Sequence, residues 1–165
     1  MSIFDLFKRS NKQKPVKRNF FNIQVGDVVT YDDRDYIVSQ VLEYNEGGYK
    51  WLDYQLVDGD DELWLGVDDD DGLELSIYEE IDLALNDLPK EISYNGEVFY
   101  REEKSRAKAV NRSDYTDTKY VDVEYADYEN EGGTKYLSVE KWNSEIEVSL
   151  GYPIKQYEVK ILPKD

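Results

Sequence analysis

Apolar and polar residues alternate with a period of two along most of the chain after residue 19. This alternation is typical of strands that bury one face of a sheet. Four such runs are Tyr36, Val38, Leu42 and Tyr44; Leu52, Tyr54 and Leu56; Leu63, Leu65 and Val67; and Leu73, Leu75 and Ile77. Clusters of Asp, Asn and Gly separate the runs and predict hairpin connections at residues 32–35, 45–48, 58–61 and 68–72.

Two segments are less clear from their pattern. Residues 82–90 are expected to form a connector that holds at most one helical turn. Residues 101–110 are rich in helix-forming side chains, but they continue directly from Phe99 and Tyr100. We therefore predict a strand for residues 101–110.

The second half of the chain resembles the first. The matched blocks are 31–36 with 94–99 (offset 63), 53–56 with 122–125 (offset 69), 64–67 with 136–139 (offset 72) and 73–77 with 146–150 (offset 73). The offset changes only between blocks, where insertions fall in turns. The pattern predicts an all-β protein of two tandem, related antiparallel β units, sandwich-like or built as small open barrels. The units span residues 20–88 and 89–165 and follow an arm and linker at residues 1–19.

Composition narrows the chemistry. The chain has 165 residues with 37 acidic and 20 basic side chains, a net charge of −17, and neither Cys nor His. Disulfides, thiol nucleophiles, imidazole bases and the usual zinc sites are therefore excluded. No nucleophile or phosphate-loop motif occurs, so we expect no enzyme and no cofactor. No apolar run of about 18 residues is found, so we expect a cytoplasmic protein.

The N-terminal arm has the opposite charge to the body. Residues 1–18 hold six basic residues and one acidic residue, a net charge of +5, which leaves −22 for the rest. An acidic body is expected to avoid nucleic acid. Its sequence predicts a short amphipathic helix or arm that docks on an anionic membrane surface or a protein partner. Its docking residues would be Phe4, Leu6, Phe7, Lys8 and Arg9.

Aromatic residues interleaved with carboxylates form a second candidate site. Such a combination suits a small cation, through ion pairs and cation–π contacts. The candidate ligand-binding residues are Trp51, Tyr54, Trp64, Tyr125, Tyr128 and Trp142. The alternative interpretation is that these side chains are ordinary core and cross-strand residues of a β protein. The acidic turn at residues 68–72 does not match the spacing of a calcium loop, and no metal site is predicted.

The motifs Val-Glu-Tyr-Ala-Asp-Tyr-Glu (123–129), Tyr-Leu-Ser-Val-Glu-Lys-Trp (136–142) and Ile-Glu-Val-Ser-Leu-Gly-Tyr-Pro-Ile (146–154) resemble a bacterial family of unknown function, number forty-one seventy-eight. Val-Gly-Asp-Val-Val-Thr-Tyr (25–31) fits the same family. The resemblance implies an all-β protein whose genes often lie near those of phage-shock-type membrane-stress proteins and polyamine-synthesis enzymes. It implies no catalytic residue.

Three functions follow as hypotheses. The first is a non-enzymatic binding or scaffold protein at the cytoplasmic face of the membrane, associated with envelope stress. The second is a small-cation sensor that binds a polyamine. The third is an acidic protein that mimics DNA.

Overall fold

The computed structural model describes residues 17–113 and 119–165, and the predicted all-β fold is confirmed there. The elements in chain order are β1 (Val28–Tyr31), β2 (Arg34–Glu46), β3 (Tyr49–Asp58), β4 (Asp61–Asp69), β5 (Leu73–Ile81), β6 (Glu91–Tyr94), β7 (Glu97–Asn111), β8 (Val121–Asn130), β9 (Tyr136–Trp142), β10 (Glu145–Ile154), the 3-10 turn η1 (Gln156–Glu158) and β11 (Val159–Leu162). Residues 101–110 belong to β7, as predicted, and residues 82–90 contain no helical turn.

Eight of the strands close into one antiparallel barrel. Their order is β2-β3-β4-β5-β10-β9-β8-β7, and the barrel closes where residues 42–45 of β2 pair with residues 108–111 of β7. Each half of the chain supplies four of these strands. The expected sandwich or pair of small open barrels is therefore wrong, because the two halves pair with each other at both edges, β5 with β10 and β2 with β7, and form one closed wall. The predicted boundary at residues 88–89 falls between β5 and β6.

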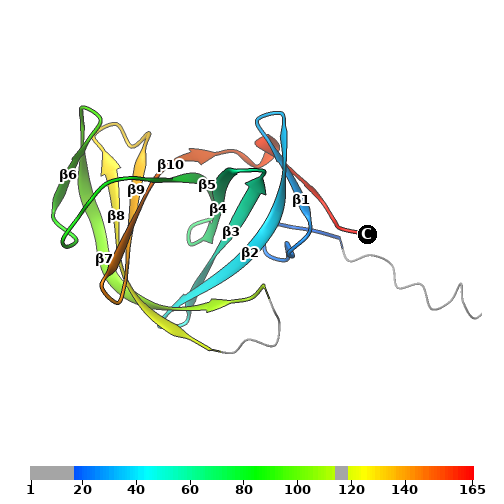
Figure 1. Cartoon of the computed structure of the whole chain (residues 1–165), viewed down its shortest axis with the longest axis horizontal. Helices are drawn as coiled ribbons and strands as arrows, with labels where there is room; N and C mark the ends of the chain where they lie inside the picture. The colour runs from blue at the N-terminus through cyan, green and yellow to red at the C-terminus, as the bar shows by residue number, and fades with distance from the viewer. Residues whose placement is uncertain (1–16, 114–118) are drawn as a thin grey trace, which may run out of the picture.

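The remaining strands lie outside the barrel. β1 pairs with β11 and with the first part of β2, while β6 pairs with the first part of β7. β1 and β6 flank the barrel on opposite sides (Figure 1). Both β2 and β7 are long because each pairs first with an outer strand and then with the other across the seam.

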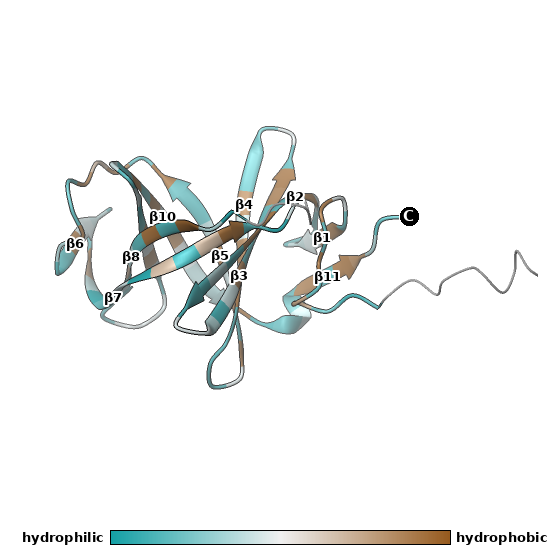
Figure 2. Cartoon of the chain, turned by 90° about the horizontal axis from the view of Figure 1, so that it is seen from below, coloured by the Kyte–Doolittle hydropathy of each residue, from teal (hydrophilic) through white to brown (hydrophobic). Residues whose placement is uncertain are grey.

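The barrel wall is apolar on its outer face and largely polar on its inner face. Tyr54, Leu65 and Ile77 lie opposite one another on β3, β4 and β5 and are buried on the outer face. Their strand neighbours Asp53 and Ser76 point the other way and line the lumen. Hydrophobic and hydrophilic segments accordingly alternate along single strands (Figure 2).

Two hydrophobic cores lie against the outer face. The first is covered by β1, β11 and the segment before β1, and the second by β6 and the connection after β5. The buried members of the first are Ile23, Val29, Tyr31, Tyr36, Val38, Val41, Tyr54, Leu56, Leu65, Val67, Leu75, Ile77 and Ile154. Those of the second are Leu88, Ile92, Phe99, Ala126, Tyr128, Leu137, Val139 and Val148. Their burial supplies most of the hydrophobic stabilisation that the polar lumen cannot provide.

A bulge at Ser39 changes which β2 residues share a face. The register moves from Val38 opposite Leu56 to Gln40 opposite Gln55, so Ser39 is an extra residue in the ladder. Tyr36, Val38 and Val41 therefore lie in the first outer core, whereas Leu42 and Tyr44 line the lumen. The prediction that Tyr36, Val38, Leu42 and Tyr44 share one face is wrong, because a bulge reverses the alternation beyond it.

The two halves repeat the same order of pairing. β7 has a bulge at Glu102, 63 residues after the bulge at Ser39, which matches the first predicted offset. Val38 pairs with Leu56, and Arg101 pairs with Tyr128, so β3 corresponds to β8 at offset 72 and not at the predicted 69. The predicted match failed because β8 carries apolar side chains on both faces. The origin of the two halves by duplication stays a prediction.

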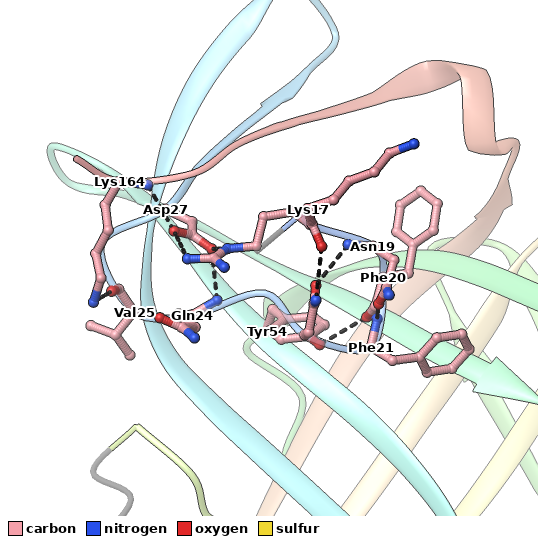
Figure 3. A network of polar contacts seen from close by, with 11 residues as sticks. Lys17, Asn19, Phe20, Phe21, Gln24, Val25, Asp27, Tyr54 and Lys164 are labelled. Carbon is pink, nitrogen blue, oxygen red and sulfur yellow. Dashed lines mark hydrogen bonds and ion pairs between the residues drawn. The ribbon is translucent and has the colours of Figure 1, made fainter. Parts of the chain in front are cut away.

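A buried carboxylate ties both ends of the barrel domain together (Figure 3). Asp27 is 0% exposed, and its Oδ2 lies 2.6 Å from Nε of Arg18. The backbone N–H groups of Gln24 and Lys164 donate to its two oxygens at 2.8 and 2.9 Å. Burial raises the pKa of Asp27, but these hydrogen bonds and the charge of Arg18 outweigh it and hold the pKa below the usual 3.8.

We expect Asp27→Asn to lower the free energy of unfolding at pH 7 by about 3 kcal/mol, because it removes the charged partner of the buried Arg18–Asp27 ion pair. A carboxyl group whose pKa is lower in the folded than in the unfolded protein stabilises the fold at pH values above its unfolded pKa. This contribution to stability is lost as the pH falls through the folded pKa. The difference between variant and parent should therefore shrink near pH 3 in urea unfolding. Asp33→Asn is the control, because Asp33 is exposed and its φ of 57° suits Asn. Equal effects of Asp27→Asn and Asp33→Asn on the free energy of unfolding would contradict the stabilising role of the buried Asp27.

Candidate functional site: an acidic, aromatic lumen

The lumen of the barrel is a cavity of about 1140 Å³. Thirteen carboxylates line it, together with one basic side chain, Lys155, in the part of the chain that the structure describes. The carboxylates are Glu46, Asp53, Glu62, Asp68, Asp70, Glu74, Glu80, Glu102, Glu103, Asp127, Glu129, Glu140 and Glu147. Its inner surface is therefore strongly negative, and a low-dielectric wall concentrates that field within the cavity.

Three carboxyl groups from different strands occupy the middle of this surface: Asp53 on β3, Asp127 on β8 and Glu140 on β9. The Tyr44 hydroxyl donates to Glu140 at 2.9 Å from Oε2 and 3.2 Å from Oε1. Among residues 17–113 and 119–165, no Lys or Arg forms an ion pair with any of the three. Ionisation of these three carboxyl groups would therefore place negative charges in the lumen that none of the described Lys or Arg side chains pairs with.

Burial and neighbouring negative charges raise the pKa values of these three carboxyl groups. Burial, reinforced by the charge of Asp53, raises the pKa of Glu140 to about 8. Burial and the charge of Asp127 raise the pKa of Asp53 to about 7, and burial with the charge of Glu103 does the same to Asp127. The three groups therefore hold protons near neutral pH, and a cation in the lumen would favour their ionised forms.

A second acidic pair lies next to the seam that closes the barrel. The Tyr125 hydroxyl is 2.5 Å from Oε2 of Glu46 and 3.1 Å from Oε1 of Glu103. The Ser105 hydroxyl also donates to Glu46. These bonds fix the two carboxylates by hydroxyl donors rather than by cations, so their charge remains available to a ligand.

Aromatic rings pack together at the same end of the lumen. The Tyr44 and Trp51 rings stack with centroids 5.2 Å apart, and Tyr125 meets Trp51 edge-on at 5.5 Å. Trp142 lies 6.3 Å from Tyr44. With Ala107, Ala109 and Val123 they form a hydrophobic cluster on the lumen side of the seam. The rings present aromatic surface directly beside the central carboxyl groups.

Two glycines keep the lumen wide at Tyr78. Gly66 and Gly151 lie on the strands beside β5, and a Cβ at residue 151 would overlap the Tyr78 ring. The ring therefore lies against the wall, above both glycines. A side chain at residue 151 would force it into the cavity.

The six aromatic residues singled out from the sequence separate into two groups. Trp51, Trp64, Tyr125 and Trp142 line the lumen and belong to neither outer core, whereas Tyr128 borders the lumen from the second outer core. The hydroxyls of the other two, Tyr54 and Tyr128, donate to the backbone oxygens of Phe20 and Pro89 at 2.8 and 2.6 Å, and both rings belong to the outer cores. Tyr54 and Tyr128 thus anchor the segments that cover the barrel.

Sequence reasoning missed the central carboxyls and Tyr44 as site residues. Asp53 stands between Leu52 and Tyr54, and Glu140 follows Val139. Charged residues at these alternating positions are typical of a solvent-facing strand surface. A signal was nevertheless present, because the carboxylates share the strand face of the tryptophans.

The predicted arm residues Phe4, Leu6, Phe7, Lys8 and Arg9 lie outside the described residues, so membrane docking stays a prediction. The described part of the chain has no helix with the length and apolar character to cross a bilayer. Nor does it bring three potential metal-ligating side chains together at one point. A truncation that tests the arm should keep Arg18, because its loss would unbalance Asp27.

Comparisons with known proteins identify relatives of this chain. The sequence model of a family described as "Domain of unknown function (DUF4178)" matches residues 24–156, which include all eight barrel strands. Uncharacterized proteins of Mycobacterium tuberculosis and Mycobacterium bovis are each 26% identical over 146 residues, covering 84% of this chain and 70% of the relative. No solved structure matches the chain.

We expect Glu140→Gln to stabilise the free protein at pH 8.5 by about 1–2 kcal/mol. A carboxyl group whose pKa is raised by folding makes its full contribution to stability at pH values below its unfolded pKa, near 4.5. That contribution is lost as the pH rises through the folded pKa of about 8. Gln removes this loss while its amide oxygen still accepts from Tyr44. The gain should therefore diminish at pH 5.5.

Urea unfolding at the two pH values measures the effect. Glu91→Gln, which changes an exposed side chain of β6 outside the cavity, is the control and should change little at either pH. Destabilisation by Glu140→Gln at pH 8.5 would contradict the conclusion that the ionised Glu140 carboxylate destabilises the folded protein.

Proposed function

The chain belongs to the DUF4178 family, as its motifs indicated, and we propose that it binds a linear polyamine inside its barrel. The observation that carries the proposal is the lumen itself. Thirteen carboxylates and one lysine surround one cavity within the described residues. Such a surface attracts cations and repels anions, which excludes phosphate-bearing ligands.

The spacing of the carboxylates favours an organic cation over a metal ion. Metal sites need several ligands at one point, and in the described ranges the acidic side chains are distributed along all eight strands. A chain with several ammonium groups can reach separate carboxylates at once. The cavity also exceeds the size range of typical small-molecule pockets, about 300–1000 Å³, and can take an extended ligand.

The aromatic rings support the same ligand class. Trp51, Trp64, Tyr125 and Trp142 line the same cavity as the carboxylates. Cation–π contacts contribute about 0.5–2 kcal/mol each when the cation is desolvated. The methylene segments of a polyamine would also cover apolar ring surface. A purely electrostatic site would not need these rings.

The DNA-mimic hypothesis is less well supported. A mimic needs its charges on an outer surface where a DNA-binding protein can reach them. Here Asp53, Asp127 and Glu140 point into the lumen. Their position fits a ligand small enough to enter the barrel.

We also infer that the barrel arose from two copies of one unit. The repeated pairing order and the bulges 63 residues apart support this origin. Four strands of each unit make half of the wall, so closure of the two units creates the lumen. The central carboxyls accordingly come from both halves, Asp53 from the first and Asp127 and Glu140 from the second.

Titration calorimetry with spermidine at about 0.15 M salt tests the function. We expect saturable binding of one ligand and a change in tryptophan fluorescence, because all three tryptophans line the lumen. Trp64→Ala and Asp53→Asn should each weaken binding about tenfold, or about 1.4 kcal/mol.

The controls are Phe21→Ala and Glu91→Gln, which change an exposed ring and an exposed carboxylate outside the lumen. Equal weakening by lumen and control variants would mean nonspecific counterion exchange. Absence of saturable binding by the parent protein would overturn the proposal.

A further inference from the structure

We propose that a cation entering the lumen displaces protons from the carboxyl groups of Asp53, Asp127 and Glu140, so that binding tightens as pH rises. This inference rests on the proposed function, because it concerns the regulation of the same site. It adds that the free barrel stores protons in place of the missing counter-cation.

The geometry places acids directly opposite acids. Glu147 on β10 pairs with Glu140 on β9, and Glu103 on β7 pairs with Asp127 on β8. Directly opposed side chains on one face of a sheet are close neighbours, and like charges there repel. Asp53 faces this group from β3 on the other half of the barrel. Full ionisation of the cluster would therefore be costly in the empty lumen.

Within the described residues, no element that faces the cluster supplies a basic side chain to relieve this repulsion. The titratable groups that face the cluster are all acids: Tyr44 and Glu46 of β2, Asp68 of β4, Tyr78 of β5, Glu103 of β7, Glu129 of β8 and Glu147 of β10. Lys155, the one basic side chain that lines the cavity in the described ranges, is exposed before η1. Protons are the remaining means of lowering the charge.

The titration of the cluster agrees with this arrangement. Burial and neighbouring charges raise the pKa of Asp53 and of Asp127 to about 7 and that of Glu140 to about 8. An ammonium group beside a carboxyl group favours the ionised form. Each neutral carboxyl group that ionises on binding gives one proton to the solvent. The negative charge that it thereby gains pairs with the ligand.

The test is calorimetry at pH 7 in two buffers of different ionisation enthalpy, with salt held at about 0.15 M. The dependence of the binding enthalpy on the buffer gives the number of protons released. Spermidine is one ligand, and hexamethonium is the second, because its two quaternary ammonium groups cannot exchange protons. We expect about one proton released per ligand with both, and affinity that rises about thirtyfold between pH 6 and 7.5, since one released proton means a tenfold change per pH unit.

Two variants locate the protons. Glu140→Gln should reduce the released protons and flatten the pH dependence, whereas Glu91→Gln should leave both unchanged. Should Glu140→Gln fail to fold, carbon-13 NMR of the side-chain carboxyls in the parent protein follows the same groups with and without ligand. We expect carboxyl titrations near pH 7–8 in the free protein that move below pH 6 when ligand is bound.

The outcomes separate the two proposals. Saturable binding whose enthalpy is the same in both buffers, with affinity independent of pH, would overturn proton displacement and leave polyamine binding intact. Ordinary carboxyl titrations near pH 4 in the free protein would overturn it as well. Absence of binding at every pH would overturn the proposed function, and this inference with it.

Discussion

The pairing of β2 with β7 is the constraint on which the site depends. Four residue pairs join strands that are more than sixty residues apart in the chain, and they convert one face of eight strands into an enclosed surface. On an open sheet, Asp53 and Glu140 would be ordinary solvated carboxylates. Closure surrounds them with low-dielectric protein and with one another. The charge of the lumen and the raised pKa values are consequences of that closure.

A barrel with a polar interior needs its hydrophobic stabilisation elsewhere. Here the apolar face of the wall points outward and is covered by β1, β11 and β6 and by the segments that flank them. Tyr54 and Tyr128 hold two of these covering segments through hydroxyl bonds to backbone oxygens. Asp27 secures the chain ends on the first core. The outer layers therefore supply stability and leave the lumen free for a ligand.

Like-charge repulsion inside the lumen is the link between stability and function. The same groups that destabilise the empty barrel at high pH would be the partners of a cation. Hydroxyl donors such as Tyr44 and Tyr125 orient the carboxylates without neutralising them. A lumen lined in this way is unfavourable when empty and ionised, and a bound polycation would relieve the repulsion. In the proposed function, this coupling would let the site discriminate by charge as well as by shape.

Local alternation was sufficient to predict the strands, the all-β fold and residues 101–110 as a strand, because side-chain direction within a strand depends only on neighbouring residues. Interleaved aromatics and carboxylates likewise singled out Trp51, Trp64, Tyr125 and Trp142, which line the lumen, while their role in binding stays a prediction. The sequence could not show which face becomes the interior, since alternation defines two faces without enclosing either. Closure depends on hydrogen bonds between distant backbones, and the bulge at Ser39 reverses the faces without a local signature. Only the tertiary structure therefore decided that the acids of the two halves meet in one lumen.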